Sequence, residues 1–225
     1  MLKKKNILNT KNIVMLDIGG NMGWYPSLLG RFGYTILTFE PLPQNYYISK
    51  RNYCLLNKNS NVIIITKGIS TEEKICDYYK DIYSFSNGMT ICNDKRNMLL
   101  NNQFQKIGKV HLTQLNNFIP YLSQKNIALI KIDVEGSEGK VLESGIELIT
   151  KYHVPFIFIE FSPKFLIEHK TNPKKFLKLL VDNGYKISIE GFLNKKYITV
   201  KELIKKTTFQ TNCYFIYKNI IEFSF

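Results

Sequence analysis

Four acidic residues of this chain each follow a short apolar run, and their side chains are the first candidates for chemistry. The four, with the runs that precede them, are Asp17 (13–16), Glu40 (35–39), Asp133 (128–132) and Glu160 (155–159). Apolar runs of this length are typical of buried strands. Ligands of an open α/β sheet bind at the carboxyl ends of its strands, and a carboxylate is costly to bury without a partner. Four acids at that edge therefore predict a functional site.

A glycine-rich turn separates the first of these strands from a helix predicted over 24–32. Glycine lets the backbone turn sharply and lets a ligand approach closely. A dinucleotide-binding turn needs glycine at positions 19, 21 and 24, whereas this chain has Gly19, Asn21 and Trp24. The chain also lacks the Gly-Lys-Ser/Thr ending of a phosphate-binding Walker loop. The turn therefore matches neither phosphate-binding pattern.

A ligand with an adenosine and a charged amino acid but no phosphates fits these residues. Asp17 at the end of the first strand can bind an ammonium group, and Glu40, 23 residues further on, can accept hydrogen bonds from both ribose hydroxyls. S-adenosylmethionine is such a ligand. Gly68 and Ile69 follow the third predicted strand (62–66) and are candidates to line the adenine pocket, although a simple strand-ending turn also explains them.

The rest of the chain alternates predicted helices and strands. Helices are expected over 43–57, 116–123, 139–152 and 173–183, and strands over 73–79, 110–113, 185–190 and 213–217. The last two strands should pair antiparallel at the far edge of the sheet, and Asn116 should cap its helix. Residues 84–109 are rich in Ser, Asn, Gly and Lys without periodicity, so we expect a mobile loop or lid there.

Length and composition indicate a single globular domain over 1–225. The chain is 44% hydrophobic and 22% charged, which is usual for such a domain, and it has no apolar run near the ~20 residues that cross a bilayer. Its formal charge of +13 permits a nucleic-acid partner, but the basic residues are spread along the chain, with a basic tail at 1–11. Four cysteines without metal-site spacing indicate reduced thiols in a cytoplasmic protein.

Taken together, the motifs resemble the FkbM-type family of S-adenosylmethionine-dependent methyltransferases. The resemblance rests on DIGGNMGWY (17–25), FEP (39–41), KIDVEGSE (131–138) and the apolar strand that ends in Glu160. It implies a Rossmann-like class I methyltransferase fold: an α/β, seven-stranded, mostly parallel sheet with a reversed C-terminal hairpin and helices on both faces. It also implies methyl transfer, usually to a hydroxyl oxygen, with carbohydrates and polyketides among the acceptors and S-adenosylhomocysteine as product.

The family's motifs assign roles to individual positions of this chain. The resemblance places Asp133 beside the methyl group and assigns cofactor binding to Asp17, Gly19, Asn21, Gly23 and Glu40. Two positions depart from the family pattern. Asn116 stands within a segment that is often Leu-Asp-Asp in the family, and Ser137 stands where a histidine is common after DVEG. A serine cannot act as a histidine base would.

Methyl transfer to a hydroxyl needs alignment of acceptor, methyl and sulfur and removal of the hydroxyl proton. The candidate bases are Asp133, which we favour, Glu135 and Glu160. A divalent ion held by these acids is the less favoured alternative, and we predict no metal. Each of His111, His153 and His169 is expected to have an ordinary surface or packing role, with His169 nearest the site.

Two other functions stay open at this point. The positive charge favours an RNA ribose 2′-O-methyltransferase, for which salt-dependent RNA binding would be the sign. A non-catalytic domain that keeps only the fold is the other alternative. We favour a glycan or small-molecule acceptor over both.

Overall fold

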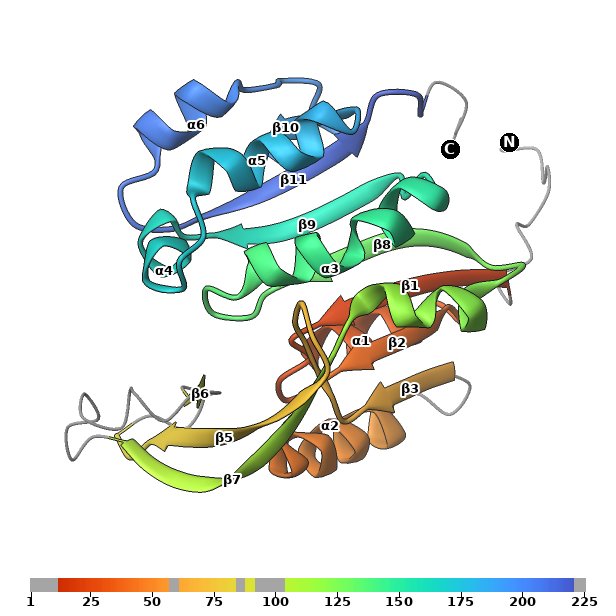
Figure 1. Cartoon of the computed structure of the whole chain (residues 1–225). Coiled ribbons are helices and arrows are strands. Elements are labelled where there is room, and N and C mark those ends of the chain that lie inside the picture. The colour runs from red at the N-terminus through yellow and green to blue at the C-terminus, as the bar shows by residue number, and fades with distance from the viewer. Residues whose placement is uncertain (1–11, 57–60, 84–87, 92–103, 221–225) are drawn as a thin grey trace.

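The structure is a computed structural model that describes residues 12–56, 61–83, 88–91 and 104–220. Its centre is a seven-stranded sheet in the order β10-β11-β9-β8-β1-β2-β3 (Figure 1). The strands are β1 (Ile13–Ile18), β2 (Thr35–Phe39), β3 (Asn61–Ile65), β8 (Asn126–Ile132), β9 (Phe156–Phe161), β10 (Tyr185–Ser188) and β11 (Thr211–Tyr217). β11 is antiparallel to both of its neighbours, and the other pairs are parallel. The predicted fold and its reversed C-terminal hairpin are confirmed.

Helices cover both faces of this sheet. They are α1 (Trp24–Gly30), α2 (Pro43–Leu56), η3 (Leu115–Leu122, a 3-10 helix), α3 (Glu138–Lys151), α4 (Pro163–Glu168), α5 (Pro173–Asp182) and α6 (Val200–Lys206). Phe161 of β9 stacks on Phe176 of α5 with ring centroids 6.1 Å apart, whereas Phe158 of β9 meets Tyr25 of α1 at 6.1 Å. Because side chains alternate along a strand, α1 and α5 lie on opposite faces.

The core explains why α3 forms where the sequence predicts it. Its apolar residues recur at helical spacing, and Val141, Leu142 and Leu148 are fully buried.

The predicted cap of the preceding helix is wrong, because Gln114 is the N-cap of η3. The Asn116 side chain instead accepts a hydrogen bond from the backbone N–H of Leu148 at 3.0 Å, which joins η3 to α3.

The segment after β3 folds into a second sheet. Its order is β4-β7-β5-β6, with β4 (Gly68–Ile69), β5 (Lys74–Asp81), β6 (Gly88–Ile91) and β7 (Phe104–Thr113). Figure 1 shows β5 and β7 extending away from the main sheet. The predicted loop over 84–109 is therefore wrong at 88–91 and at 104–109, which are strands. The rest of that loop and the tail at 1–11 lie outside the described residues.

A small apolar cluster packs the second sheet beside the end of β2. Leu42, which follows Glu40 by two residues, is buried together with Tyr78 of β5 and Val110 of β7. Cys76 belongs to the same cluster and is disulfide-bonded, so the expectation of reduced thiols throughout is wrong at this position. Among the helices within the described ranges, none combines the length and apolarity needed to span a bilayer.

Candidate active site

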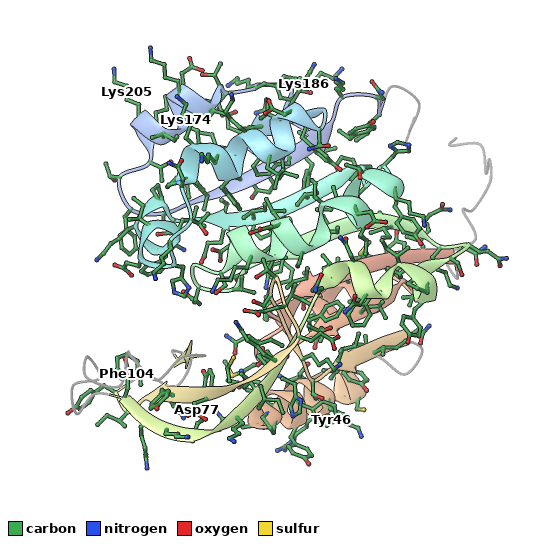
Figure 2. All side chains as sticks on the ribbon, in the orientation of Figure 1. Tyr46, Asp77, Phe104, Lys174, Lys186 and Lys205 are labelled. Carbon is green, nitrogen blue, oxygen red and sulfur yellow. The ribbon has the colours of Figure 1, made fainter. Side chains whose placement is uncertain are left out.

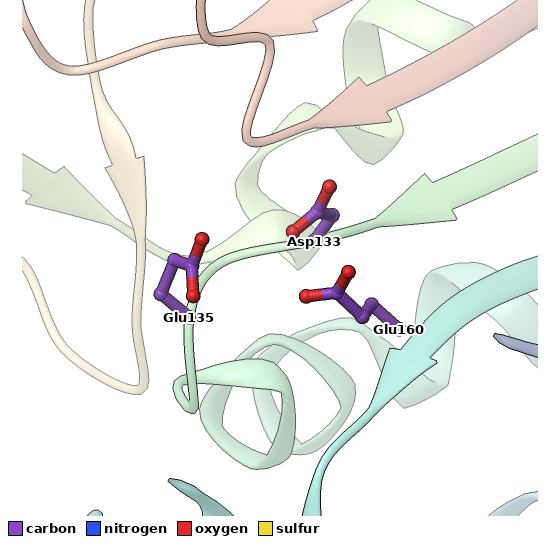
Figure 3. Close-up of side chains that lie close together, drawn as sticks. All are labelled: Asp133, Glu135 and Glu160. Carbon is purple, nitrogen blue, oxygen red and sulfur yellow. The ribbon is translucent and has the colours of Figure 1, made fainter. Parts of the chain in front are cut away.

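The strand register brings the predicted acids to one edge of the main sheet. Lys131 of β8 pairs with Phe158 of β9, so Asp133 and Glu160, each two residues further on, point to the same face. Glu135 joins them from the turn that follows β8. Figure 3 shows the three carboxylates gathered together, and one oxygen from each lies within 4.8 Å of the others (Figure 3). Sequence reasoning placed all three at this edge.

A buried lysine, which sequence reasoning did not single out, links the acids of β1 and β8. The Lys131 Nζ lies 3.3 Å from Asp17 Oδ1 and 3.4 Å from Asp133 Oδ2, and it donates a hydrogen bond to the Gly19 carbonyl at 2.7 Å. Burial alone would lower the pKa of Lys131, but the two carboxylates raise it above its ordinary value. The signal in the sequence was a lysine inside an apolar strand, two residues before Asp133.

Glu40 joins the glycine-rich turn to the end of β2. Its carboxylate accepts hydrogen bonds from the backbone N–H groups of Asn21 at 2.8 Å and Leu42 at 2.9 Å. The Asn45 side chain donates to the same carboxylate at 3.3 Å. Burial raises the pKa of Glu40 although these donors oppose the shift. A carboxylate offers about four lone-pair positions. Oε1 accepts from both Leu42 and Asn45, whereas Oε2 accepts only from Asn21 and keeps capacity for a ribose hydroxyl.

The turn itself needs glycine at two of the predicted cofactor positions. Gly19 has φ +86°, and a Cβ there would lie 1.8 Å from the carbonyl oxygen of Asp133. Gly23 has φ +82°, and a Cβ there would lie 2.2 Å from the Ser49 Oγ. Asn21, between them, also has a positive φ of 47°. The close approach of β1 and β8 therefore depends on Gly19, and the packing of α1 on α2 depends on Gly23.

The turn after β8 is held by Glu138. This buried carboxylate accepts hydrogen bonds from the N–H groups of Val134 at 3.0 Å and Gly136 at 3.1 Å. Glu135 lies in that turn with a positive φ of 53°, which is uncommon for a residue other than glycine. Glu138 therefore fixes the backbone that presents Glu135 to the acid cluster.

Glu160 has the most strongly shifted carboxyl of the cluster. Burial, followed by the charges of Asp133 and Glu135, raises the pKa of Glu160 to about 7. Burial and the charge of Asp133 also raise the pKa of Glu135, which Lys131 partly opposes. Oxygen ligands gathered in this way could also hold a divalent cation.

An aromatic row continues the site across the sheet. Tyr25 lies over Lys131 with Nζ 5.2 Å from the ring centroid, and its ring is 6.1 Å from that of Phe158. Phe158 in turn lies 5.3 Å from Tyr214 of β11, and Asn212 of β11 pairs with Glu160. Aromatic rings therefore border the carboxylates on the α1 side of the sheet.

The second sheet borders the opposite side of the site. Burial, together with the charges of Glu40 and Glu135, raises the pKa of Tyr78 to about 12. Sequence reasoning missed Tyr78, which lies in the stretch with the weakest periodicity.

Ile69 is buried in the main core, and a Cβ on Gly68 would lie 2.7 Å from the Leu112 side chain. A contact of Gly68 and Ile69 with adenine stays a prediction.

The three histidines are placed apart. His169, after α4, lies 3.2 Å from the hydroxyl of Ser137 through its Nδ1, so the chain brings an imidazole to the residue that follows the DVEG motif. His153 is exposed and stacks on Tyr217 with centroids 5.6 Å apart. His111 lies exposed in β7.

The chain is similar in sequence and fold to known methyltransferases. A family model described as Methyltransferase FkbM domain matches residues 17–187. Methyltransferase FkbM from Methylobacillus flagellatus KT is 16% identical with a TM-score of 0.50, and the match covers 92% of this chain but only 44% of that one. No curated protein matches the chain.

Two further solved structures contain the cofactor or its product. Sp1610 from Streptococcus pneumoniae, in complex with S-adenosyl-L-methionine, is 12% identical with a TM-score of 0.46, over 92% of this chain and 67% of that one. Magnesium protoporphyrin IX methyltransferase (ChlM) from Synechocystis PCC 6803, with bound SAH, is 10% identical with a TM-score of 0.46, over 93% of this chain and 75% of that one.

Proposed function

Because this chain belongs to the FkbM family of methyltransferases, whose cofactor is S-adenosylmethionine, we propose that it methylates a hydroxyl oxygen of a carbohydrate or small molecule. The observation that carries this proposal is the cluster of Asp133, Glu135 and Glu160. A hydroxyl must lose its proton as it attacks the methyl group, and this cluster supplies proton acceptors at the edge where ligands of such sheets bind.

The cofactor lies against the β1 turn in this proposal. Asp17 and Asp133 face its amino acid portion and methyl group, and Glu40 accepts from its ribose hydroxyls. The backbone of Gly19, Asn21 and Gly23 contacts the cofactor along the turn. Gly68 and Ile69 border the adenine. The remaining lone-pair position on Glu40 Oε2, which accepts one hydrogen bond against two at Oε1, supports the ribose contact.

Glu160 is the better placed of the candidate bases, ahead of Asp133. Asp133 is already paired with Lys131 at 3.4 Å, so part of its capacity to accept a hydrogen bond is in use. Glu160 has a pKa of about 7, and a general base works best near the operating pH. As the acceptor oxygen bonds to the methyl carbon, the carbon–sulfur bond breaks, S-adenosylhomocysteine leaves and the hydroxyl proton passes to Glu160.

A hydroxylated ring fits the surroundings of these acids. Phe158 and Tyr214 offer apolar ring faces beside the carboxylates, and Asn212, exposed next to Glu160, offers both a donor and an acceptor. Binding sites for small molecules combine such apolar walls with a few polar groups. This combination suits the two sides of a sugar ring, which are apolar across C–H bonds and polar at hydroxyls.

The test is transfer of radiolabelled methyl groups from S-adenosylmethionine to a panel of acceptors. The panel contains methyl glycosides, oligosaccharides, polyhydroxylated small molecules and an RNA transcript, each with Mg²⁺ or with EDTA. We expect label in a hydroxylated carbohydrate or small molecule and not in RNA, and a rate lowered about 10²–10⁴-fold in Glu160→Gln.

Other results would contradict the proposal. Label only at ribose 2′-hydroxyls would favour an RNA methyltransferase. A folded protein that fails to bind S-adenosylhomocysteine would be a non-catalytic domain. Loss of activity in EDTA that Mg²⁺ restores would assign the acid cluster to a cation.

A further inference from the structure

Charge is distributed unevenly along this chain, contrary to the expectation of scattered basic residues. Residues 163–218 contain twelve lysines against four acids, a net charge of +8, whereas 12–162 contain fifteen basic and thirteen acidic residues. A uniform bias in composition would enrich lysine in both parts. The excess of lysine therefore belongs to one part of the fold.

Most of these lysines lie on one margin of the molecule, which we call the β10 margin and define as α5, β10, residues 189–199 and α6. Its exposed lysines are Lys174, Lys175, Lys178, Lys186, Lys195, Lys196, Lys201, Lys205 and Lys206. Figure 2 shows Lys174, Lys186 and Lys205 along this margin, far from Tyr46, Asp77 and Phe104 on the other side (Figure 2). β10 is the last strand of the sheet, so the margin faces away from the core.

Few acids neutralise these lysines. Within the described residues, the margin's one recorded ion pair joins Lys196 and Glu190 at 3.4 Å, and that pair is exposed. Glu202 is engaged in the capping box of α6 with Thr199. Lys186 lies over the Tyr197 ring, 4.8 Å from its centroid. The margin therefore presents a broad positive surface to solvent, which attracts anionic partners over long range.

The same margin exposes a large apolar side chain. Leu193 is 86% exposed in the turn after β10, two residues before Lys195, which Lys196 follows. Tyr197 is 46% exposed in the same segment. An exposed leucine and an aromatic ring among lysines are typical of surfaces that lie on a lipid bilayer, where the apolar group enters the headgroup boundary.

Nucleic acid is the less fitting polyanion. Residues 163–218 contain no arginine, whereas the planar guanidinium of arginine is the group that matches phosphate with two hydrogen bonds. Leu193 would gain nothing from a phosphate backbone. Anionic lipids, by contrast, attract lysines as point charges, each contributing to binding in proportion to the surface potential.

We propose that the β10 margin binds peripherally to anionic membranes, with its lysines on the lipid headgroups and Leu193 inserted at the boundary. The chain connects this margin to the acid cluster. α6 ends at Lys206 and β11 begins at Thr211, and the next residue, Asn212, pairs with Glu160. Binding by this margin does not depend on the acceptor proposed above, and it is tested separately.

The experiment is sedimentation of the full chain with vesicles of phosphatidylcholine alone or with added phosphatidylglycerol, at low and high salt. We expect binding only to the anionic vesicles, weakened by salt. Reversing three charges (Lys174→Glu, Lys178→Glu, Lys205→Glu) should weaken binding about a hundredfold, and Leu193→Asn should weaken it about tenfold. The matched controls are Lys50→Glu, Lys67→Glu and Lys109→Glu for charge, and Leu55→Asn for the exposed leucine, which is 72% exposed.

The controls decide the outcome. Equal loss of binding in the control triple variant would show a net-charge effect and overturn the assignment to this margin. Absence of binding to anionic vesicles, with or without tight binding to an oligouridine RNA, would overturn the membrane proposal. Circular dichroism of each variant establishes that it is folded before binding is compared.

Discussion

Lys131 and Asp17 face each other on paired strands in the buried part of the sheet, with Nζ and Oδ1 3.3 Å apart and side chains only 5% and 3% exposed. The β1–β8 register sets these two residues opposite one another. Lys131 also reaches Asp133, so one ammonium group lies between two carboxylates of the site and offsets part of their charge. The pairing of β1 with β8 thus supplies a positive charge that partly compensates the acids of the proposed methyl-transfer site.

Removal of this lysine should destabilise the protein severely. Lys131→Met leaves Asp17 buried beside an apolar side chain, and breaking a buried ion pair from one side costs about 3–5 kcal/mol. Urea unfolding followed by circular dichroism measures the loss. The double variant with Asp17→Asn should recover much of it, because the buried charge is removed and Asp133, the other partner of Lys131, is 33% exposed. A loss below about 1 kcal/mol in the single variant would show that the pair is not desolvated in solution.

Stability should fall as pH rises through the range in which Glu160 ionises. The pKa of Glu160 is about 7 in the folded protein and near 4.3 when unfolded, so the folded state binds more protons between these values. The stability from the protonated form is complete below about pH 4 and is lost as pH rises toward 7. Urea unfolding at pH 5 and pH 7.5 should show this loss in the wild type and less of it in Glu160→Gln. An equal loss in both proteins would assign the titration to another group.

The sequence was sufficient to predict the main sheet and the acid edge. The parallel strands of that sheet are mostly apolar runs of ordinary length, and strand ends of a parallel sheet share an edge by geometry. The strand pattern alone therefore predicts that Asp133 and Glu160 lie close together. Lys131 was missed because its role depends on register: only the pairing with β1 shows that it lies opposite Asp17.

The strands predicted over 73–79 and 110–113 are confirmed as parts of β5 and β7, but the first half of β7 and the pairing into a second sheet could not be predicted. β7 exposes residues 105–109 in succession, so apolar and polar positions do not alternate there as they do when one face is buried. Tyr78, which reaches the site from this sheet, was hidden for the same reason. Asn116 shows a different limit, since an asparagine can cap its own helix or bind a distant N–H, and only the packing of η3 on α3 decides between them.

Glu40 should control cofactor affinity. In Glu40→Ala the backbone N–H groups of Asn21 and Leu42 lose their acceptor, and the proposed ribose hydroxyls lose theirs as well. Hydrogen bonds to a charged group contribute about 1.5–3 kcal/mol, so calorimetric titration with S-adenosylhomocysteine should show affinity lowered by roughly 10- to 150-fold. Glu143→Ala, on the exposed side of α3, is the control and should bind as the wild type does. Unchanged affinity in a folded Glu40→Ala would place the ribose elsewhere.

Gly19 should tolerate no side chain, whereas Gly33 should tolerate one at modest cost. Both have positive φ, +86° and +78°, but a Cβ on Gly19 would lie 1.8 Å from the Asp133 carbonyl oxygen and one on Gly33 would meet no atom within 4 Å. Gly33→Ala should therefore cost only the backbone strain, about 1–2 kcal/mol. Gly19→Ala must also separate the ends of β1 and β8, so its loss should exceed about 4 kcal/mol and S-adenosylhomocysteine binding should disappear. Urea unfolding and calorimetry on the two variants measure the difference, and equal losses would mean that β1 and β8 do not approach as closely in solution as they do here.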